Sequence, residues 1–183
     1  HEEGGARILH GLQNSATMDS TPPISMISSA TTARRSWPSF VRYFTGVSRE
    51  SARIIDEQAR NAREGAAVSL EAMHQLKAEA VQMKENLLQG DLAGFARTLQ
   101  QGWQAKKRMA SSISNPMIDA LEALAMDNGA KATKVSGAGG GGFMMFVCDP
   151  VDRMRLSGAL RTQGGSLLDF HFSPGGATAW RVP

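Results

Sequence analysis

The sequence predicts an α+β fold, in which helices pack on one side of a small antiparallel sheet. Segments with helical periodicity separate the strand-like segments, and residues 143–148 form a continuous apolar run that suits a strand covered on both faces. A run of glycines joins this strand to the preceding one. The predicted strands are 40–44, 131–136, 143–148 and 167–172.

Composition and charge limit the class of protein. The 183 residues, 42% of them hydrophobic, suffice for one domain with a core and a tail. The net charge is only +3, so we expect no nucleic-acid partner. We expect no membrane partner either, because no apolar run reaches the roughly 18 residues that a spanning helix needs. Cys148 is the only cysteine, which excludes an intramolecular disulfide and fits a reducing, cytoplasmic location.

The first part of the chain differs from the rest. Residues 15–39 are rich in Ser, Thr and Pro and show neither helical periodicity nor alternation. We therefore predict an atypical, poorly ordered N-terminal segment at 1–39 and a folded domain at 40–183. A transit peptide is the alternative interpretation, although such signals begin at the N-terminus and this segment does not.

The folded domain is predicted to begin with a strand and two helices. Phe40 to Phe44 forms the strand, and a turn at 45–48 leads into a helix that begins near Arg49. Ser69 is the predicted N-cap of a longer helix that ends at Gly90. The buried stripe of this longer helix is predicted to be Met73, Leu76, Ala80, Met83 and Leu87.

Capping residues predict three further helices. Asp91 can cap a helix that forms a tight hairpin with the preceding one. Asn115-Pro116 combines a cap with proline at the first helical position, Asn128-Gly129 ends that helix, and Asp149-Pro150 begins the last one in the same way. The residues predicted to point inward are Leu92, Phe95, Leu99 and Trp103 in the first, and Ile118, Leu121, Leu124 and Ala125 in the second.

The glycine run is the most informative feature for function. Five of the six residues at 137–142 lack a side chain, so the backbone there can adopt positive φ and approach an anion or another backbone closely. A flexible hairpin connection is the plain alternative. The dinucleotide-binding fingerprint is rejected because no helix follows the glycines, and the P-loop is rejected because no Lys-Ser or Lys-Thr pair closes them.

The surroundings of the glycine run carry a family resemblance. The segments Ile113-Ser114-Asn115-Pro116, Gly129-Ala130 and 134–143 closely resemble the C-terminal motif of the GHMP small-molecule kinases. The turn at 43–52 is similar to that of the D-glycero-D-manno-heptose 7-phosphate kinase branch. The resemblance, which spans about residues 40 to 172, implies a ferredoxin-like C-terminal domain with the glycine motif at the cleft that it forms with an N-terminal domain.

The resemblance also implies an activity: transfer of the ATP γ-phosphate, aided by Mg²⁺, to the C1 hydroxyl of a sugar phosphate. The glycine motif would then help to shape the phosphoryl-transfer site. Neither of the isolated histidines at 74 and 171 has metal-ligand spacing, so we predict no metal ligands of the protein's own. The residues implied to lie near phosphate or nucleotide are Ser136, Gly137, Ala138, Gly139, Gly140, Gly141 and Gly142.

The turn after the first strand is the implied substrate-binding segment, with residues Thr45, Gly46, Ser48 and Arg49. The planar fork of Arg49 suits a phosphate, and an exposed first-turn arginine is the alternative. Lys134 could reach phosphate, but a lysine on a strand is more often solvated. The run Lys106-Lys107-Arg108 is interpreted as cations at the end of a helix, where they meet the helix dipole.

Two motifs of the family are not found in this sequence. The first is the family's Gly-Leu-Gly-Ser-Ser nucleotide loop. The second is a Gly-Leu-Gln-Asp-Gln-like segment that carries the catalytic aspartate, and the short match at 11–15 has Asn14 in place of that aspartate. Because the match is so short, chance similarity is the alternative. An amide cannot accept the proton. We therefore expect no intact catalytic residue and little activity from this chain alone.

Two other functions stay open: a non-catalytic module that binds a metabolite or a protein, and a kinase fragment with another small-molecule substrate. The upstream sequence of the gene separates the first of these from a kinase. Self-association through the exposed interdomain face is a further expectation, because an apolar face would lack its covering domain.

Overall fold

The structure is a computed structural model that describes residues 40–47, 51–65, 67–170 and 179. The predictions on residues 1–39, including Asn14, and on Ser48 and Arg49 lie outside these residues. In chain order, the elements are β1 (Phe40–Phe44), α2 (Ser51–Arg63), α3 (Ala67–Gln89), α4 (Leu92–Lys107), η2 (Ser111–Ile113), α5 (Pro116–Asp127), β2 (Ala130–Val135), β3 (Phe143–Cys148), η3 (Pro150–Asp152), α6 (Arg153–Arg161) and β4 (Ser166–Leu168).

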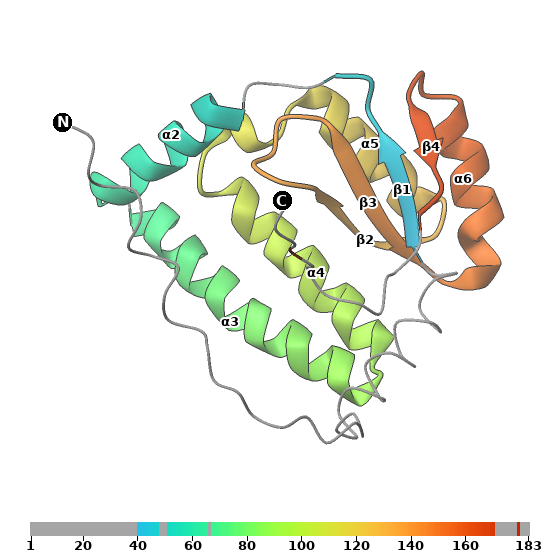
Figure 1. Ribbon diagram of the computed structural model, residues 1–183, viewed down its shortest axis with the longest axis horizontal. Helices are drawn as coiled ribbons and strands as arrows, with labels where there is room; N and C mark the ends of the chain where they lie inside the picture. The colour runs from blue at the N-terminus through green and yellow to red at the C-terminus, as the bar shows by residue number, and fades with distance from the viewer. Residues whose placement is uncertain (1–39, 48–50, 66, 171–178, 180–183) are drawn as a thin grey trace.

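The four strands form one antiparallel sheet in the order β2-β3-β1-β4. Helices connect β1 to β2 and β3 to β4, while β2 and β3 are consecutive and are joined by the glycine loop (Figure 1). This is the split β-α-β arrangement of ferredoxin-like domains. The predicted α+β fold with a small antiparallel sheet is therefore confirmed.

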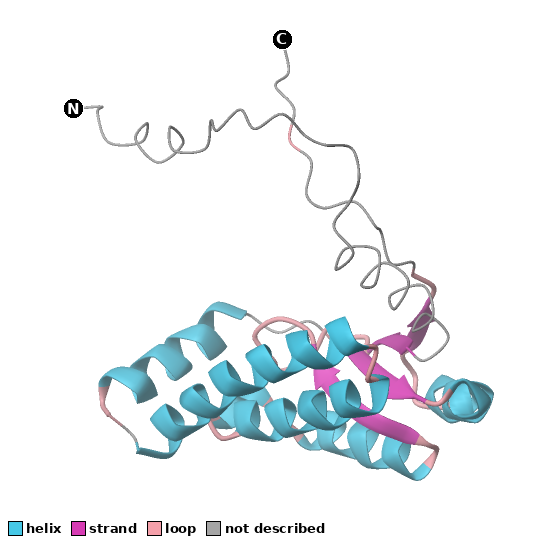
Figure 2. Ribbon diagram, turned by 90° about the horizontal axis from the view of Figure 1, so that it is seen from below, coloured by secondary structure: helices cyan, strands magenta, loops and turns pink. Residues whose placement is uncertain are grey.

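The helices surround the sheet unevenly. Alternate residues of β1 and β3, such as Tyr43 and Phe146, form the main core with the buried residues of α5 and α6. Helix α4 packs along the edge strand β2, and α3 packs on the outer side of α4 (Figures 1 and 2). A smaller cluster that includes Phe40 and Leu99 fills the space between α4 and the other face of the sheet. No described helix is long and apolar enough to cross a bilayer.

Most predicted helix ends are confirmed by their caps. The Asp91 side chain accepts a hydrogen bond from the Gly94 amide at 2.8 Å, and the Asn115 side chain accepts one from the Ile118 amide at 3.0 Å. Gly129 follows α5 with a φ of 96°. Strand β4 is shorter than predicted, since its pairing with β1 covers only Ser166–Leu168. Residues 171 and 172 lie outside the described part.

The prediction for α3 was wrong in two respects. Ser69 is not the N-cap but a buried residue within the helix, which begins at Ala67. The predicted stripe is also displaced, because Met73 is 42% exposed while the polar Glu79 and Asn86 are buried. Ala80 is exposed as well. The physical reason is that α3 faces α4 with polar side chains, as in the hydrogen bond of 3.2 Å from Asn86 Nδ2 to Thr98 Oγ1.

A buried carboxylate joins α4 to α5. Glu122 Oε1 accepts hydrogen bonds from Gln100 and Gln104, at 2.9 and 2.7 Å, and Oε2 accepts from Trp103 Nε1 and Lys107 Nζ, at 2.8 and 3.0 Å. Gln100 also accepts a hydrogen bond of 2.8 Å from the Thr133 amide on the outer edge of β2. Helix α4 therefore pairs with a sheet edge that would otherwise be open.

The junction of η2 and α5 holds the glycine loop. The Gly140 amide donates to the Ile113 carbonyl at 2.8 Å, and the Asn115 side chain donates to the Gly140 carbonyl at 3.0 Å. A Cβ on Gly139 would lie 2.7 Å from the Ile113 carbonyl oxygen, whereas one on Gly137 would meet nothing within 4 Å. Only a glycine at 139 allows this close approach of the loop to η2.

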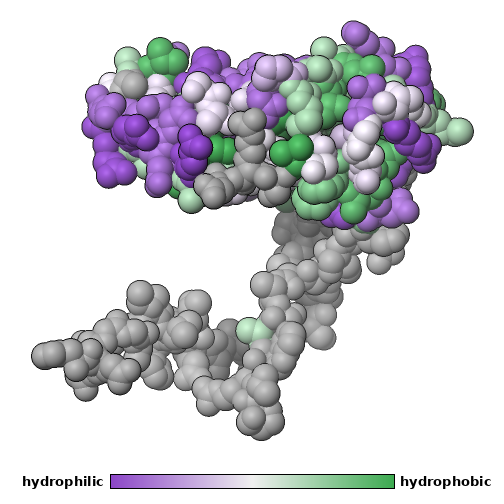
Figure 3. Space-filling model, turned by 90° about the horizontal axis from the view of Figure 1, so that it is seen from above, coloured by the Kyte–Doolittle hydropathy of each residue, from purple (hydrophilic) through white to green (hydrophobic). Residues whose placement is uncertain are grey.

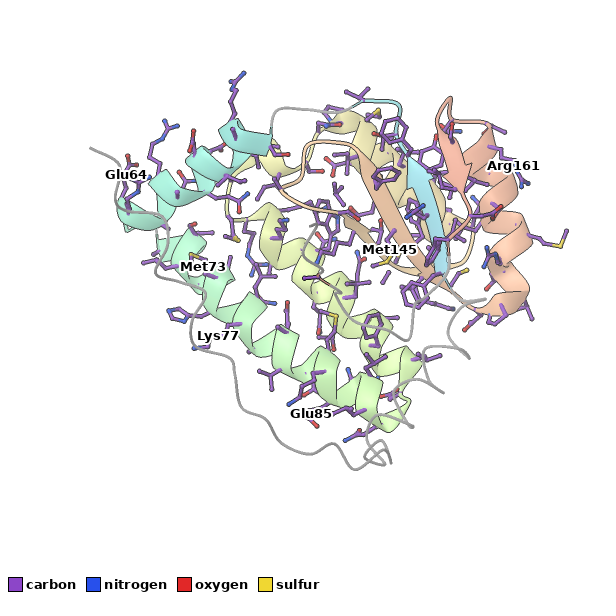
Figure 4. All side chains as sticks on the ribbon, in the orientation of Figure 1. Glu64, Met73, Lys77, Glu85, Met145 and Arg161 are labelled. Carbon is purple, nitrogen blue, oxygen red and sulfur yellow. The ribbon has the colours of Figure 1, made fainter. Side chains whose placement is uncertain are left out.

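We predict that Glu122→Gln lowers the free energy of unfolding by about 2–3 kcal/mol, because the amide presents its NH₂ group to two buried donors and loses the charge opposite Lys107. Urea denaturation followed by circular dichroism measures this change. Glu85→Gln is the matched control, since the Glu85 side chain on α3 (Figure 4) is 45% exposed and, within the described ranges, its ion pair is with Lys84 at 2.9 Å. Equal losses in the two variants would contradict the role assigned to Glu122.

We predict that Gly139→Ala destabilises the chain by about 3 kcal/mol or more and Gly137→Ala by about 1 kcal/mol. Both glycines have positive φ, 121° and 77°, but only Gly139 adds a clash with backbone. The same denaturation experiment compares them. If Gly139→Ala is as stable as Gly137→Ala, the loop does not depend on its close approach to Ile113.

Candidate functional site

Three segments that are distant in the sequence meet at one end of the sheet. They are the turn after β1 at 45–47, the junction of η2 and α5 at 113–115, and the glycine loop at 137–142 (Figure 1). Figure 3 views this end from above and shows hydrophilic residues gathered over α2 and hydrophobic residues toward the β1 and β4 side. The structure thus brings the predicted phosphate-binding and substrate-binding segments together.

The glycine loop is fastened to the turn after β1. The Gly142 amide donates to the Val47 carbonyl at 2.7 Å and to Thr45 Oγ1 at 3.1 Å, and the Thr45 amide donates to the Gly142 carbonyl at 2.9 Å. A Cβ on Gly141 would lie 2.7 Å from the Val47 carbonyl oxygen. The absence of a side chain at 141 is therefore needed for this contact.

These contacts divide the amides of the loop into two groups. The amides of Gly140 and Gly142 donate to protein carbonyls, so they are not available to a ligand. The other four amides, of Gly137, Ala138, Gly139 and Gly141, have no acceptor among the described residues, and Gly139 and Gly141 are buried. The bare backbone of this loop thus serves first for contact with neighbouring segments, and only the unengaged amides of Gly137 and Ala138 belong to residues that are not buried.

The remaining predicted site residues have different surroundings. Ser136 is exposed, and its amide continues the β2–β3 pairing by donating to Phe143 at 2.8 Å. The carbonyl of Gly137 accepts a hydrogen bond from Lys106 Nζ, and that of Ala138 accepts one from Gln58 at 3.5 Å. Gly137 is exposed, whereas Ala138 is half-buried and packs against the main core.

In the turn that was predicted to bind substrate, the Thr45 hydroxyl donates to the Val47 carbonyl at 3.1 Å and accepts from the Gly142 amide. This hydroxyl therefore serves the turn itself. Gly46 is exposed with a φ of 79°, a conformation that glycine adopts without strain. Ser48 and Arg49, which follow it, are the two predicted residues of this turn that lie outside the described part.

The sequence did not reveal how α2 holds η2. Glu57 accepts hydrogen bonds from the amide and hydroxyl of Ser111, at 2.8 and 2.9 Å, and from the Ser112 hydroxyl. The Ser112 hydrogen bond is the largest cause of a lowered pKa for the Glu57 carboxyl, which therefore stays ionised. The only signal in the sequence was the serine pair before the Asn-Pro cap, and its partner could not be named from it.

Helix α2 also borders a large hollow that the sequence did not predict. Arg53, Asp56, Glu57 and Arg60 share one face of the helix, since they are spaced by three, one and three residues. The hollow measures about 910 Å³. The described residues that line it are Arg53, Ile54, Asp56, Glu57, Arg60, Asn61 and Ser112. Guanidinium groups beside carboxylate and amide groups can bind a molecule that carries both phosphate and hydroxyl groups.

Groups that could hold a metal or act as a nucleophile are few. No set of three or more His, Cys, Asp or Glu side chains is placed to bind a metal ion within the described ranges. Burial raises the pKa of the Cys148 thiol to about 11, so this thiol stays protonated and has no nucleophilic role at neutral pH.

The sequence matches a known protein family and two characterised relatives. Residues 83–165 match the family model described as GHMP kinases C terminal. The chain is 41% identical over 142 residues to the D-glycero-alpha-D-manno-heptose 7-phosphate kinase of Campylobacter jejuni, which covers 78% of this chain and 41% of the relative. It is 29% identical over 115 residues to the L-fucokinase/L-fucose-1-P guanylyltransferase of Bacteroides fragilis, covering 62% of this chain and 12% of that protein.

A solved structure extends the comparison to three dimensions. The crystal structure of a D-glycero-D-manno-heptose 1-phosphate kinase from Bacteroides thetaiotaomicron is 30% identical, with a TM-score of 0.56, and the match covers 84% of this chain and 39% of that one. The chain thus spans about two-fifths of the length of the heptose-phosphate kinases that it matches. By its sequence and its fold, the chain belongs to the GHMP kinase family and carries the family's C-terminal domain.

Proposed function

We propose that this chain is the C-terminal part of an ATP-dependent kinase that phosphorylates heptose 7-phosphate at its C1 hydroxyl. The observation that carries the proposal is the identity to the heptose 7-phosphate kinase relative, which extends over most of this chain. The turn at 43–52, which resembles the same branch, lies beside the glycine loop through Thr45 and Val47. We also propose a reducing, cytoplasmic setting, which suits the buried thiol of Cys148.

The glycine loop supports a role as one wall of the phosphoryl-transfer site. Its amide and carbonyl contacts to the segments at 113–115 and 45–47 fix its position, so the unengaged amides of Gly137 and Ala138, which are not buried, are already positioned for an anion. Donors that are already positioned stabilise developing charge better than mobile ones. In this proposal, the loop backs the nucleotide phosphates and the remainder of the kinase supplies the other walls.

The hollow beside α2 is our candidate for part of the sugar-phosphate site. Arg53 and Arg60 can pair with the phosphate of the substrate, and Asp56 can accept hydrogen bonds from sugar hydroxyls. Arg49, predicted for the same role, precedes α2 by two residues. The hollow and the glycine loop are neighbours, because Glu57 binds Ser112 and the adjacent Gln58 binds Ala138.

ATP and Mg²⁺ fit this chain only in part. The loop and the lysines beside it offer donors to phosphate, whereas the described residues offer no carboxylate cluster for Mg²⁺. The sequence also lacks the family's nucleotide loop and shows Asn14 where the short match would place the aspartate. We therefore propose that this 183-residue chain alone does not complete the catalytic site.

A second candidate is a kinase of the same family with another sugar substrate. The relatives include an L-fucokinase and a structure described as a heptose 1-phosphate kinase, so the position of the substrate phosphate differs among them. A non-catalytic module that keeps the glycine loop and the hollow for binding is the third. Both candidates keep the fold. The second transfers a phosphoryl group to a different substrate, and the third transfers none.

We predict no turnover by the 183-residue chain in a coupled ADP-release assay with ATP, Mg²⁺ and heptose 7-phosphate, because the chain lacks the nucleotide loop and the general base. The Campylobacter relative assayed in parallel is the positive control. Turnover near the typical enzyme rate of about 10 s⁻¹ would refute the proposed incompleteness. Heptose 1-phosphate, L-fucose and mevalonate, tested with the same relative, separate the first two candidates.

We predict weak self-association of this chain at high concentration. Val47 and Phe143, which are 44% and 40% exposed, lie beside the glycine loop at the proposed interdomain face. Exposed apolar surface of this kind favours association when its covering domain is missing. Light scattering over a range of concentrations measures the mean mass. A constant monomer mass up to the highest concentration would rule the expectation out.

A further inference from the structure

Two lysines flank the outer side of the glycine loop. Lys106 lies in the last turn of α4, and its Nζ donates a hydrogen bond to the Gly137 carbonyl. Lys134 lies in β2 opposite Met145, on the face of the sheet away from α5 and α6. Both lysines are half-buried, and neither has a carboxylate within 4.0 Å in the described part of the chain. Figure 4 labels Met145 on this face.

The neighbouring Lys107 shows how unusual this pair is. Lys107 Nζ lies 3.0 Å from Glu122 and 3.7 Å from Asp119, and it also lies 5.6 Å from the centre of the Trp103 ring. The charge of Lys107 is therefore balanced by two carboxylates and an aromatic ring. Among the described residues, Lys106, one residue earlier, has only the Gly137 carbonyl as a hydrogen-bond partner, and the charge of Lys134 acts on it.

The positive charges of Lys106 and Lys134 also repel each other. Burial is the main cause of a lowered pKa for Lys106, and the charge of Lys134 lowers that pKa further. Holding a half-buried cation beside another cation disfavours the charged form of the protein. A bound anion between them removes this penalty, which gives the pair a preference for negatively charged ligands.

The loop leaves space and a further donor beside the pair. Ser136 follows Lys134 by two residues, so in the extended pairing of this segment both side chains lie on the same face. Ser136 and Gly137 are exposed. A Cβ built on Gly137 would meet no other atom within 4 Å, so no side chain blocks a ligand from this part of the loop.

We propose that Lys106, Lys134 and Ser136 form a binding site for a phosphate group at the outer side of the glycine loop. Two ammonium groups and a hydroxyl match the oxygen atoms of a phosphate, and Lys is a common phosphate-binding residue. The ligand is the phosphate of a nucleotide or of a sugar phosphate. The site adds a contact to the proposed function but is tested without it, because binding is measured in the absence of turnover.

The test is a calorimetric titration of the 183-residue chain with inorganic pyrophosphate at low ionic strength. We expect binding at one site, weakened about tenfold in Lys106→Met and in Lys134→Met, as for the loss of one charge-assisted hydrogen bond. Lys77→Met is the matched control, since Lys77 is exposed on α3 (Figure 4), and we expect unchanged binding. No binding, or equal loss in all three variants, would overturn the proposal.

A second measurement needs no variant and so does not depend on the folding of one. Acetylation of the unmodified chain by acetic anhydride, followed by mass spectrometry, reports the accessibility of each lysine. Pyrophosphate should protect Lys106 and Lys134 severalfold and leave Lys77 unprotected. Equal labelling of Lys106 and Lys134 with and without pyrophosphate would contradict the site, whatever the calorimetry gives.

Competition then identifies the source of the phosphate. Displacement of pyrophosphate by ADP but not by heptose 7-phosphate assigns the site to the nucleotide, and the reverse assigns it to the sugar phosphate. Displacement by neither, with inorganic phosphate equally ineffective, would overturn the proposal that the site receives a phosphorylated metabolite. Failure of turnover in the kinase assay leaves these outcomes unaffected.

Discussion

The carboxylate of Glu122 is the interaction on which the arrangement of the other elements depends. Its two oxygens accept four hydrogen bonds from α4, so they fix α4 against α5 in both distance and rotation. Gln100 extends the network to the Thr133 amide and so places β2 as well. Because β2 leads into the glycine loop and the residues before α5 receive it, one buried charge positions both supports of the loop.

That arrangement explains why the loop contains so many glycines. A phosphate cradle needs exposed amides, but at Gly139 and Gly141 the structure requires the absence of a Cβ for contact with the backbone at Ile113 and Val47. The loop therefore joins the turn after β1 to the junction before α5. Its backbone is therefore held in place by contacts within the protein itself.

The sequence predicted the parts of the fold that local signals determine. Strand β3 has the predicted bounds, and α5 begins at the predicted Asn-Pro pair because the cap acts within three residues of it. The role of residues 137–142 near phosphate was predicted from their glycine content together with the family resemblance of their flanks, and it stays a prediction. The direction of each amide could not be predicted, since it depends on carbonyl groups at Ile113 and Val47, which are distant in the sequence. The four-donor role of Glu122 was missed for the same reason.

The failure at α3 has a more specific cause. Gly94, Thr98 and Gly102 recur every four residues along α4, and a Cβ on Gly102 would lie 2.8 Å from Glu79 Oε2 while one on Gly94 would lie 3.1 Å from the Asn86 side chain. The small residues of α4 thus bring the helices close enough for the polar side chains of α3 to be buried between them. A stripe of apolar residues predicts the buried face of a helix only when its partner presents apolar residues. Here the residues that decide which face of α3 is buried lie on α4. The hydrogen bond between Asn86 and Thr98 also favours one alignment of α3 along α4, which apolar packing alone would define less well.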